Sequence, residues 1–147
     1  MTLYRSIGET ELNSLLNDIV ITGRYQNKLE KYNTSSCDNV VCFFAEPIRW
    51  KDSKHLFHIA IEIDENDKRI VDRGVGTYMA AKAFATTKIW TGRKGSVKYE
   101  LPEVYLSEYS VKDVRIVDGL YRYAKWYIRD VINPLLEKHS NIELGQF

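Results

Sequence analysis

"VKYELPEVYLSEYSVKDVRIV", residues 97–117, contains two strand patterns that decide how the rest of the chain is read. "VKYELPEVYL" and "KDVRIVD" are rich in β-branched and aromatic residues, and polar residues separate them. Glu100 and Glu103 stand on either side of Pro102 within the first strand. Two interpretations are open: this is an edge strand, where charges and proline discourage further pairing, or one carboxylate is placed for chemistry.

The residues before this stretch predict a strand, a helix and a long loop, followed by more strands. "TLYRSI" (2–7) is typical of a short strand, and Ser6 and Glu9 form a capping-box pattern for the helix that follows. The apolar stripe of that helix consists of Leu12, Leu15, Leu16 and Ile19. Residues 24–38 are polar and rich in turn formers, which predicts a long loop of the kind that often carries function.

Residues 39–46 form a continuous apolar run typical of a buried strand, and residues 55–64 alternate between apolar and polar positions. The alternation places His58 on the polar side, where a structural or exposed role is expected. Residues 77–90 predict a second helix, and a third is expected from near Asp118 to Pro134. Because strands often follow strands directly, the fold class is α+β with a mixed or antiparallel sheet in one domain, residues 1–147.

Composition excludes several classes of function. The chain has 147 residues, a formal net charge of +1 and 44% apolar residues, which suits one globular domain and provides no global charge for nucleic-acid binding. No segment matches a signal peptide, a membrane span or the spacing of a metal site, so a cytoplasmic protein without a bound metal is expected. Cys37 and Cys42 are read as thiols in a reducing compartment.

Four features follow one another along the chain: Arg5 in "LYRSI", the "NTSSC" run (33–37), "FFAEP" (43–47), and Glu103 in "PEVYL". Together they resemble the ADP-ribosyltransferase superfamily over residues 2–118, and "VVCFFAEPIRW" with "HLFHIAIEID" is similar to its small bacterial and phage-type members. The resemblance implies an ADP-ribosyltransferase-like split mixed/antiparallel β-sheet with flanking helices. It also implies a mono-ADP-ribosyltransferase that transfers ADP-ribose from NAD to a macromolecular target, in phage–host conflict or a toxin system.

The resemblance implies that Glu103 is the catalytic residue, in preference to Glu100, because "EVYL" continues the strand as it does in the family. Cleavage of NAD builds positive charge on the ribose, and a fixed carboxylate stabilises such a charge. The family's arginine-modifying members carry Glu or Gln two residues before the catalytic Glu, where this chain has Leu101. Arginine is therefore not the expected acceptor, and a protein target or a nucleic acid is left open.

The remaining site residues that the resemblance implies are all assigned to NAD. Arg5 is expected to bind the pyrophosphate or to orient the ribose, because a guanidinium presents a rigid fork of donors. A hydroxyl of Ser35 or Ser36 is expected to position the nicotinamide ribose or the catalytic carboxylate. Phe44 or Tyr78 is expected to stack against the nicotinamide.

A basic stripe on the last predicted helix supports a different class of function. Arg122, Lys125 and Arg129 follow the spacing i, i+3, i+7 opposite the apolar face. A solvated helix face is the ordinary explanation of such a stripe. The functional alternative is a non-catalytic phage or bacterial inhibitor protein that binds a host protein or a nucleic-acid machine.

Overall fold

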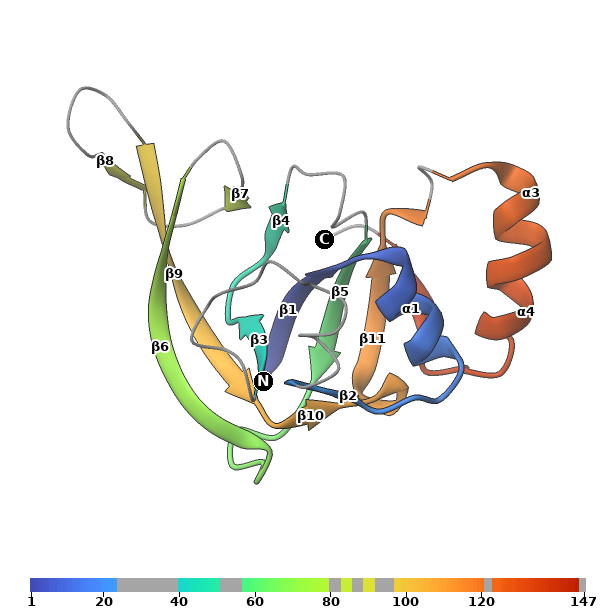
Figure 1. Ribbon diagram of the computed structural model, residues 1–147, viewed down its shortest axis with the longest axis horizontal. Coiled ribbons are helices and arrows are strands. Elements are labelled where there is room, and N and C mark those ends of the chain that lie inside the picture. Colours follow the sequence, from blue (N-terminus) through green and yellow to red (C-terminus); the bar gives the residue numbers. More distant parts are fainter. Residues whose placement is uncertain are drawn as a thin grey trace.

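The computed structural model describes residues 1–23, 40–50, 57–79, 83–85, 89–91, 97–120 and 123–145. Within these residues an eight-stranded sheet is flanked by short helices (Figure 1). Every strand pair of the sheet is antiparallel except one. The predicted α+β class with a mixed, mostly antiparallel sheet is confirmed.

The large sheet has the strand order β12–β11–β5–β1–β3–β9–β6, and β8 pairs with the first residues of β9. Its members are β1 (Thr2–Ile7), β3 (Val41–Phe44), β5 (Phe57–Glu62), β6 (Ile70–Met79), β8 (Ile89–Thr91), β9 (Val97–Leu106), β11 (Val114–Asp118) and β12 (Glu143–Leu144). Two small sheets pair β2 (Ile21–Thr22) with β10 (Glu108–Tyr109), and β4 (Ile48–Trp50) with β7 (Ala83–Ala85). Figure 1 shows β6 and β9 as a long curved pair at one end of the large sheet.

The helical segments lie toward the other end of the sheet, near β11 (Figure 1). Helix α1 (Glu9–Leu16) follows β1, and the 3-10 turn η2 (Val111–Asp113) precedes β11. The last helical segment consists of α3 (Lys125–Tyr127), the π-helical turn η4 (Ile128–Ile132) and α4 (Asn133–Leu136). It is tied to α1 by a hydrogen bond that Tyr127 Oη donates to Glu9 Oε1 at 2.5 Å.

Alternation along β1 defines two faces of the large sheet. Leu3, Arg5 and Ile7 point to the face on which α1 packs, here called the α1 face, and Tyr4 and Ser6 point to the distal face. The main hydrophobic core lies on the α1 face. It joins residues of β1, β3, β5, β9 and β11 to the buried leucines of α1, Leu12, Leu15 and Leu16.

Helix α1 starts later than the capping pattern predicts. Ser6 is the fifth residue of β1, and Gly8 is the N-cap, with no side-chain hydrogen bond to the first turn. Ile19 lies beyond the end of α1 and is exposed, so the predicted stripe ends at Leu16. The capping-box prediction was wrong because Ser6 is held in the ladder between β1 and β5.

The helix predicted over residues 77–90 was also wrong. The described residues of this range are strands: β6 runs to Met79, Ala83–Ala85 form β7, and Ile89 opens β8. Thr77, Tyr78 and Met79 pair with Glu100, Tyr99 and Lys98 of β9. Ala83–Ala85 pair with β4, and Ile89 pairs with Tyr99 of β9. Pairing with strands from elsewhere in the sequence therefore overrides the helical pattern, since helix propensity is a weak local preference.

Strand β9 matches the predicted bounds 97–106 but does not lie at the edge of the sheet. It is flanked by β6 from Lys98 to Leu106, with β8 beside its first residues and β3 beside its second half on the other side. Pro102 sits beside the end of β3, where its carbonyl accepts a hydrogen bond from Ala45 N at 2.9 Å. A proline is tolerated there because the missing N–H falls where the ladder with β3 stops.

The last helix begins at Lys125, seven residues after Asp118, which is the final residue of β11. Its hydrogen-bond pattern widens to a π-helical turn at Ile128–Ile132, directly before the segment that contains Pro134. Because proline has no N–H to donate to the preceding turn, the pattern changes there without ending the helix.

Arg69 clamps the turn between β5 and β6 against η2. Its guanidinium bonds Asp67 through Nε and NH2 at 3.0 Å, and Asp113 through NH1 at 2.7 Å and NH2 at 2.9 Å. Asp113 also caps η2 by accepting the backbone N–H of Ser110 at 2.9 Å. The hydrogen bonds from Arg69 lower the pKa of Asp67 below its ordinary value.

The lowered pKa of Asp67 implies that the stability of the protein depends on pH. A carboxyl whose folded pKa is depressed contributes stability above its ordinary pKa of 3.8 and loses it as the pH falls through its folded value. Asp67→Asn is therefore expected to lower the free energy of unfolding at neutral pH, with the difference from wild type shrinking in acid. Urea denaturation at several pH values measures the free energy of unfolding of the variant and of the wild type. Glu65→Gln, a change of an exposed neighbouring carboxylate, is the control, and an equal pH-dependent loss in that variant contradicts the assignment.

Candidate functional site

Arg5 is buried on the α1 face as one half of an ion pair. Its Nε and NH2 donate to Oε1 and Oε2 of Glu11 at 3.0 and 3.1 Å, and NH1 donates to the carbonyl of Cys42 at 3.0 Å. The guanidinium carbon lies 5.9 Å from the centre of the Phe43 ring, within the range of a cation–π contact. The guanidinium fork is thus directed at α1 and β3.

Tyr109 completes this buried cluster from β10. Its hydroxyl donates to Glu11 Oε1 at 2.7 Å. Burial, followed by the neighbouring Glu11 charge, raises the pKa of Tyr109 well above its ordinary value, which keeps the hydroxyl protonated as a donor. Arg5 donates to Glu11 of α1 and to Cys42 of β3, and Tyr109 of β10 donates to the same Glu11 carboxylate, so the described contacts of Arg5 lie within the protein and lend no support to its expected role in binding NAD.

Glu103 lies on the other face of the sheet. Tyr4 is opposite Phe44, and Phe44 is opposite Glu103, across β1, β3 and β9. Residues directly opposite each other in antiparallel strands share a face. Tyr4, Phe44 and Glu103 therefore form one row on the distal face, and Arg5 lies on the opposite side of the sheet.

Glu103 is buried, with only 6% of the residue exposed. Its Oε2 accepts a hydrogen bond from the hydroxyl of Tyr105, two residues along the same strand and on the same face. Gly74 of β6 stands opposite Glu103, and the Tyr105 hydroxyl lies against the space where a side chain at Gly74 would begin. A small residue at position 74 leaves room for Tyr105 to reach the carboxylate.

Glu100 differs from Glu103 in burial and direction. It is exposed, and its odd spacing from Glu103 along β9 turns it to the α1 side of the sheet. Leu101 is fully buried and shares the distal face with Glu103. Of the two carboxylates weighed in the sequence, Glu103 is the one held in a buried, hydrogen-bonded position.

A second polar row lies beside the first on the distal face. Ser6, His58 and Asp118 are opposite one another across β1, β5 and β11, and they are 4%, 1% and 1% exposed. Ser6 Oγ lies 2.8 Å from His58 Nδ1. This contact joins β1 to β5 within the covered part of the sheet, which favours a structural role.

This row and Tyr105 were missed in the sequence. His58 is buried because the distal face of β5 is covered as well as the α1 face. The two-residue period of the strands could have predicted them, because it places Ser6 on the same face as Tyr4 and Tyr105 on the same face as Glu103.

The other predicted residues are only partly placed. Phe44 is buried in the row between Tyr4 and Glu103. Tyr78 belongs to β6 opposite Tyr99, and its side chain lies outside the described residues. Ser35, Ser36 and Cys37 fall wholly outside them.

The predicted basic stripe is weaker than its spacing suggests. Arg129 bonds its neighbour Asp130 through Nε at 2.7 Å and NH2 at 3.0 Å, which offsets its charge. Lys125 is exposed, and Arg122 lies outside the described residues. This pattern gives little support to nucleic-acid binding, which depends on several cations facing the phosphates.

No family model, curated protein or solved structure matches the chain. In the part of the chain that the structure describes, none of the helices has the length and apolar character needed to cross a membrane. Nor do three or more His, Cys, Asp or Glu side chains among those residues gather in a way that could hold a metal ion.

The buried pair on the α1 face leads to a stability prediction. Arg5→Met leaves the Glu11 carboxylate buried without its cation, and loss of one partner of a buried pair costs about 3–5 kcal/mol. The free energy of unfolding, measured by urea denaturation, is expected to fall by this amount. The double variant Arg5→Met, Glu11→Leu is expected to recover much of it.

Arg129→Met is the matched control, because it breaks an ion pair with Asp130 whose side chains are both exposed. Its unfolding midpoint is expected to equal that of the wild type, since exposed pairs contribute little. Equal stability of the Arg5→Met and wild-type proteins contradicts the structural role of Arg5.

Proposed function

We propose that this chain is an NAD-dependent mono-ADP-ribosyltransferase with an ADP-ribosyltransferase-like fold, in which Glu103 is the catalytic carboxylate. The observation that carries the proposal is the buried Glu103 side chain on the distal face, beside Phe44 and hydrogen-bonded by Tyr105. The sheet order gives further support, because β1, β3 and β9 are neighbours and carry or follow the motifs of the resemblance.

The proposed reaction replaces nicotinamide by an acceptor at the ribose. The bond between C1′ of the ribose and the nicotinamide nitrogen breaks, and its electron pair leaves with nicotinamide. The acceptor nucleophile then bonds to C1′ and gives up its proton. Between these events the ribose carries positive charge, which a fixed carboxylate in a site with little water stabilises more strongly than water does.

The neighbours of Glu103 fit this task. The Tyr105 hydroxyl holds the carboxylate in one orientation, so that little reorganisation is needed during the reaction. Phe44 stands directly opposite Glu103 on β3, and its ring is proposed to stack against the nicotinamide. The NAD contacts proposed for Ser35, Ser36 and Tyr78 rest on the family resemblance alone. No NAD contact is proposed for Arg5.

The acceptor is proposed to be a group other than arginine on a macromolecular target. Leu101 stands where arginine-modifying members of the family carry Glu or Gln, and it is fully buried on the Glu103 face. A target protein is the first choice and a nucleic acid the second. A setting in phage–host conflict or a toxin system comes with the resemblance.

Glu103→Gln tests the proposal, because it keeps the size of the side chain and removes its charge. The protein is incubated with NAD labelled in the adenylate and with a bacterial lysate, and both label transfer and nicotinamide release are measured. Loss of a group that stabilises transition-state charge is expected to lower the rate about 10²-fold or more. Glu100→Gln, on the exposed carboxylate, is the matched control and is expected to keep the wild-type rate.

Two outcomes contradict the proposal. One is a wild-type protein that neither binds NAD, releases nicotinamide nor transfers label. The other is full activity in a folded Glu103→Gln variant. Thermal melting of each variant establishes that it is folded before its rate is compared.

A second candidate function is a non-catalytic inhibitor that binds a host protein through the last helical segment. Trp126 is 59% exposed there, between tyrosine and lysine neighbours, and large aromatic residues are enriched in protein interfaces. This candidate predicts unchanged biological activity of Glu103→Gln and weaker partner binding by Trp126→Ala.

A further inference from the structure

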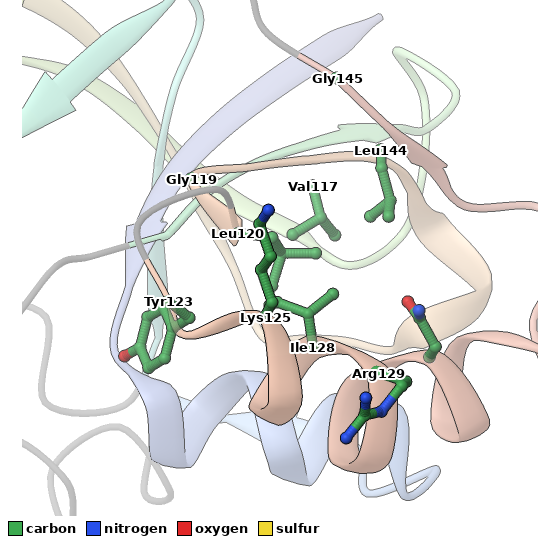
Figure 2. Close-up of a pocket in the computed structure, with 10 residues that line it drawn as sticks. Val117, Gly119, Leu120, Tyr123, Lys125, Ile128, Arg129, Leu144 and Gly145 are labelled. Carbon is green, nitrogen blue, oxygen red and sulfur yellow. The ribbon is translucent and has the colours of Figure 1, made fainter.

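A cavity lies at the far end of the sheet from Glu103, between β11, β12 and the last helical segment (Figure 2). Its volume is about 550 Å³, within the usual range for small-molecule sites. Three strands separate β11 from β9, which at the usual strand spacing is roughly 19 Å. The cavity is therefore distinct from the proposed catalytic site.

The lining of the cavity is mainly apolar. It includes Val117 from β11, Leu120, Tyr123, Ile128 from the π-helical turn, and Leu144 from β12. Leu144 is 49% exposed, so apolar surface stands open at the cavity. A ligand that covers such surface gains the free energy of removing it from water.

Two unusual backbone features border the cavity. After β11, Gly119 adopts a positive φ of 104°, a conformation that other residues rarely adopt, and the chain turns away toward the last helix. On the helix side, the π-helical turn Ile128–Ile132 contributes two lining residues. Single π-helical turns within α-helices occur frequently at functional sites.

Lys125 brings a positive charge to this apolar cavity. In Figure 2 its side chain extends from the helix toward Leu120 at the cavity. Lys125 has no hydrogen bond or ion pair with any residue that the structure describes, whereas Arg129, which also lines the cavity, is paired with Asp130. No acidic residue is among the side chains that line the cavity.

We propose that this cavity binds a small amphiphilic anion, with its apolar body against Val117, Ile128 and Leu144 and its carboxylate on the Lys125 ammonium. Charge complementarity selects the head group, and the apolar lining selects the tail. The site does not depend on Glu103, so it stands or fails independently of ADP-ribosyl transfer.

Octanoate, octanol and octylamine test the proposal, because they share a tail and differ in the charge of the head group. Binding to the full chain is measured by titration calorimetry below the concentrations at which the probes form micelles. Octanoate is expected to bind best, with roughly tenfold higher affinity than octanol because it adds a charge-assisted hydrogen bond, and octylamine is expected to bind worst.

Two variants locate the binding site. Lys125→Met keeps the apolar stem of the side chain and is expected to reduce the affinity for octanoate to that for octanol. Leu144→Asn is expected to weaken octanoate and octanol alike. Lys138→Met, on an exposed lysine that does not line the cavity, is the matched control and is expected to change neither.

Equal affinity for the three probes overturns the proposal, as does the absence of saturable octanoate binding. An unchanged octanoate affinity in folded Lys125→Met also overturns it. Repeating the titration with Glu103→Gln separates this site from the catalytic proposal, because octanoate binding is expected to be the same in that variant.

Discussion

The buried ion pair between Arg5 and Glu11 is the interaction on which the α1 side of the structure depends. A guanidinium and a carboxylate can leave water together only if their hydrogen bonds are satisfied. Here the carbonyl of Cys42 and the hydroxyl of Tyr109 complete the set, so that β1, α1, β3 and β10 meet at one point. The position of α1 over the sheet follows from this cluster together with its buried leucines, because displacing the helix would leave two charges buried and unpaired.

The same cluster changes how the functional motifs are interpreted. Family resemblance assigns Arg5 and Glu103 to one ligand, but the sheet places them on opposite faces. What the distal face offers instead is a carboxylate with a tyrosine hydroxyl and an aromatic ring beside it, next to a buried hydroxyl–imidazole–carboxylate row. The catalytic proposal therefore rests on Glu103 and its immediate neighbours. The α1 face provides the rigid support behind it.

Part of this arrangement could be predicted from the sequence. Arg5 stands between Leu3 and Ile7 at the two-residue spacing that marks one face of a strand. This spacing could have predicted that Arg5 points into the core. The helix expected over residues 77–90 could not be ruled out from the local sequence, because the strands found there form by pairing with β9 and β4, which lie elsewhere in the chain. His58 was read as polar-facing by the same alternation, and only the covering of the second face makes that position buried.

The sequence by itself determined the α+β class and the strands at 2–7 and 97–106, because their two-residue periods and β-branched content act over a few neighbouring residues. Only the tertiary structure decided which of the two carboxylates of β9 is buried, what Arg5 binds, and that Lys125 stands over an apolar cavity. Each of these depends on strand register and helix packing between residues far apart in the chain, and no local pattern specifies such pairings.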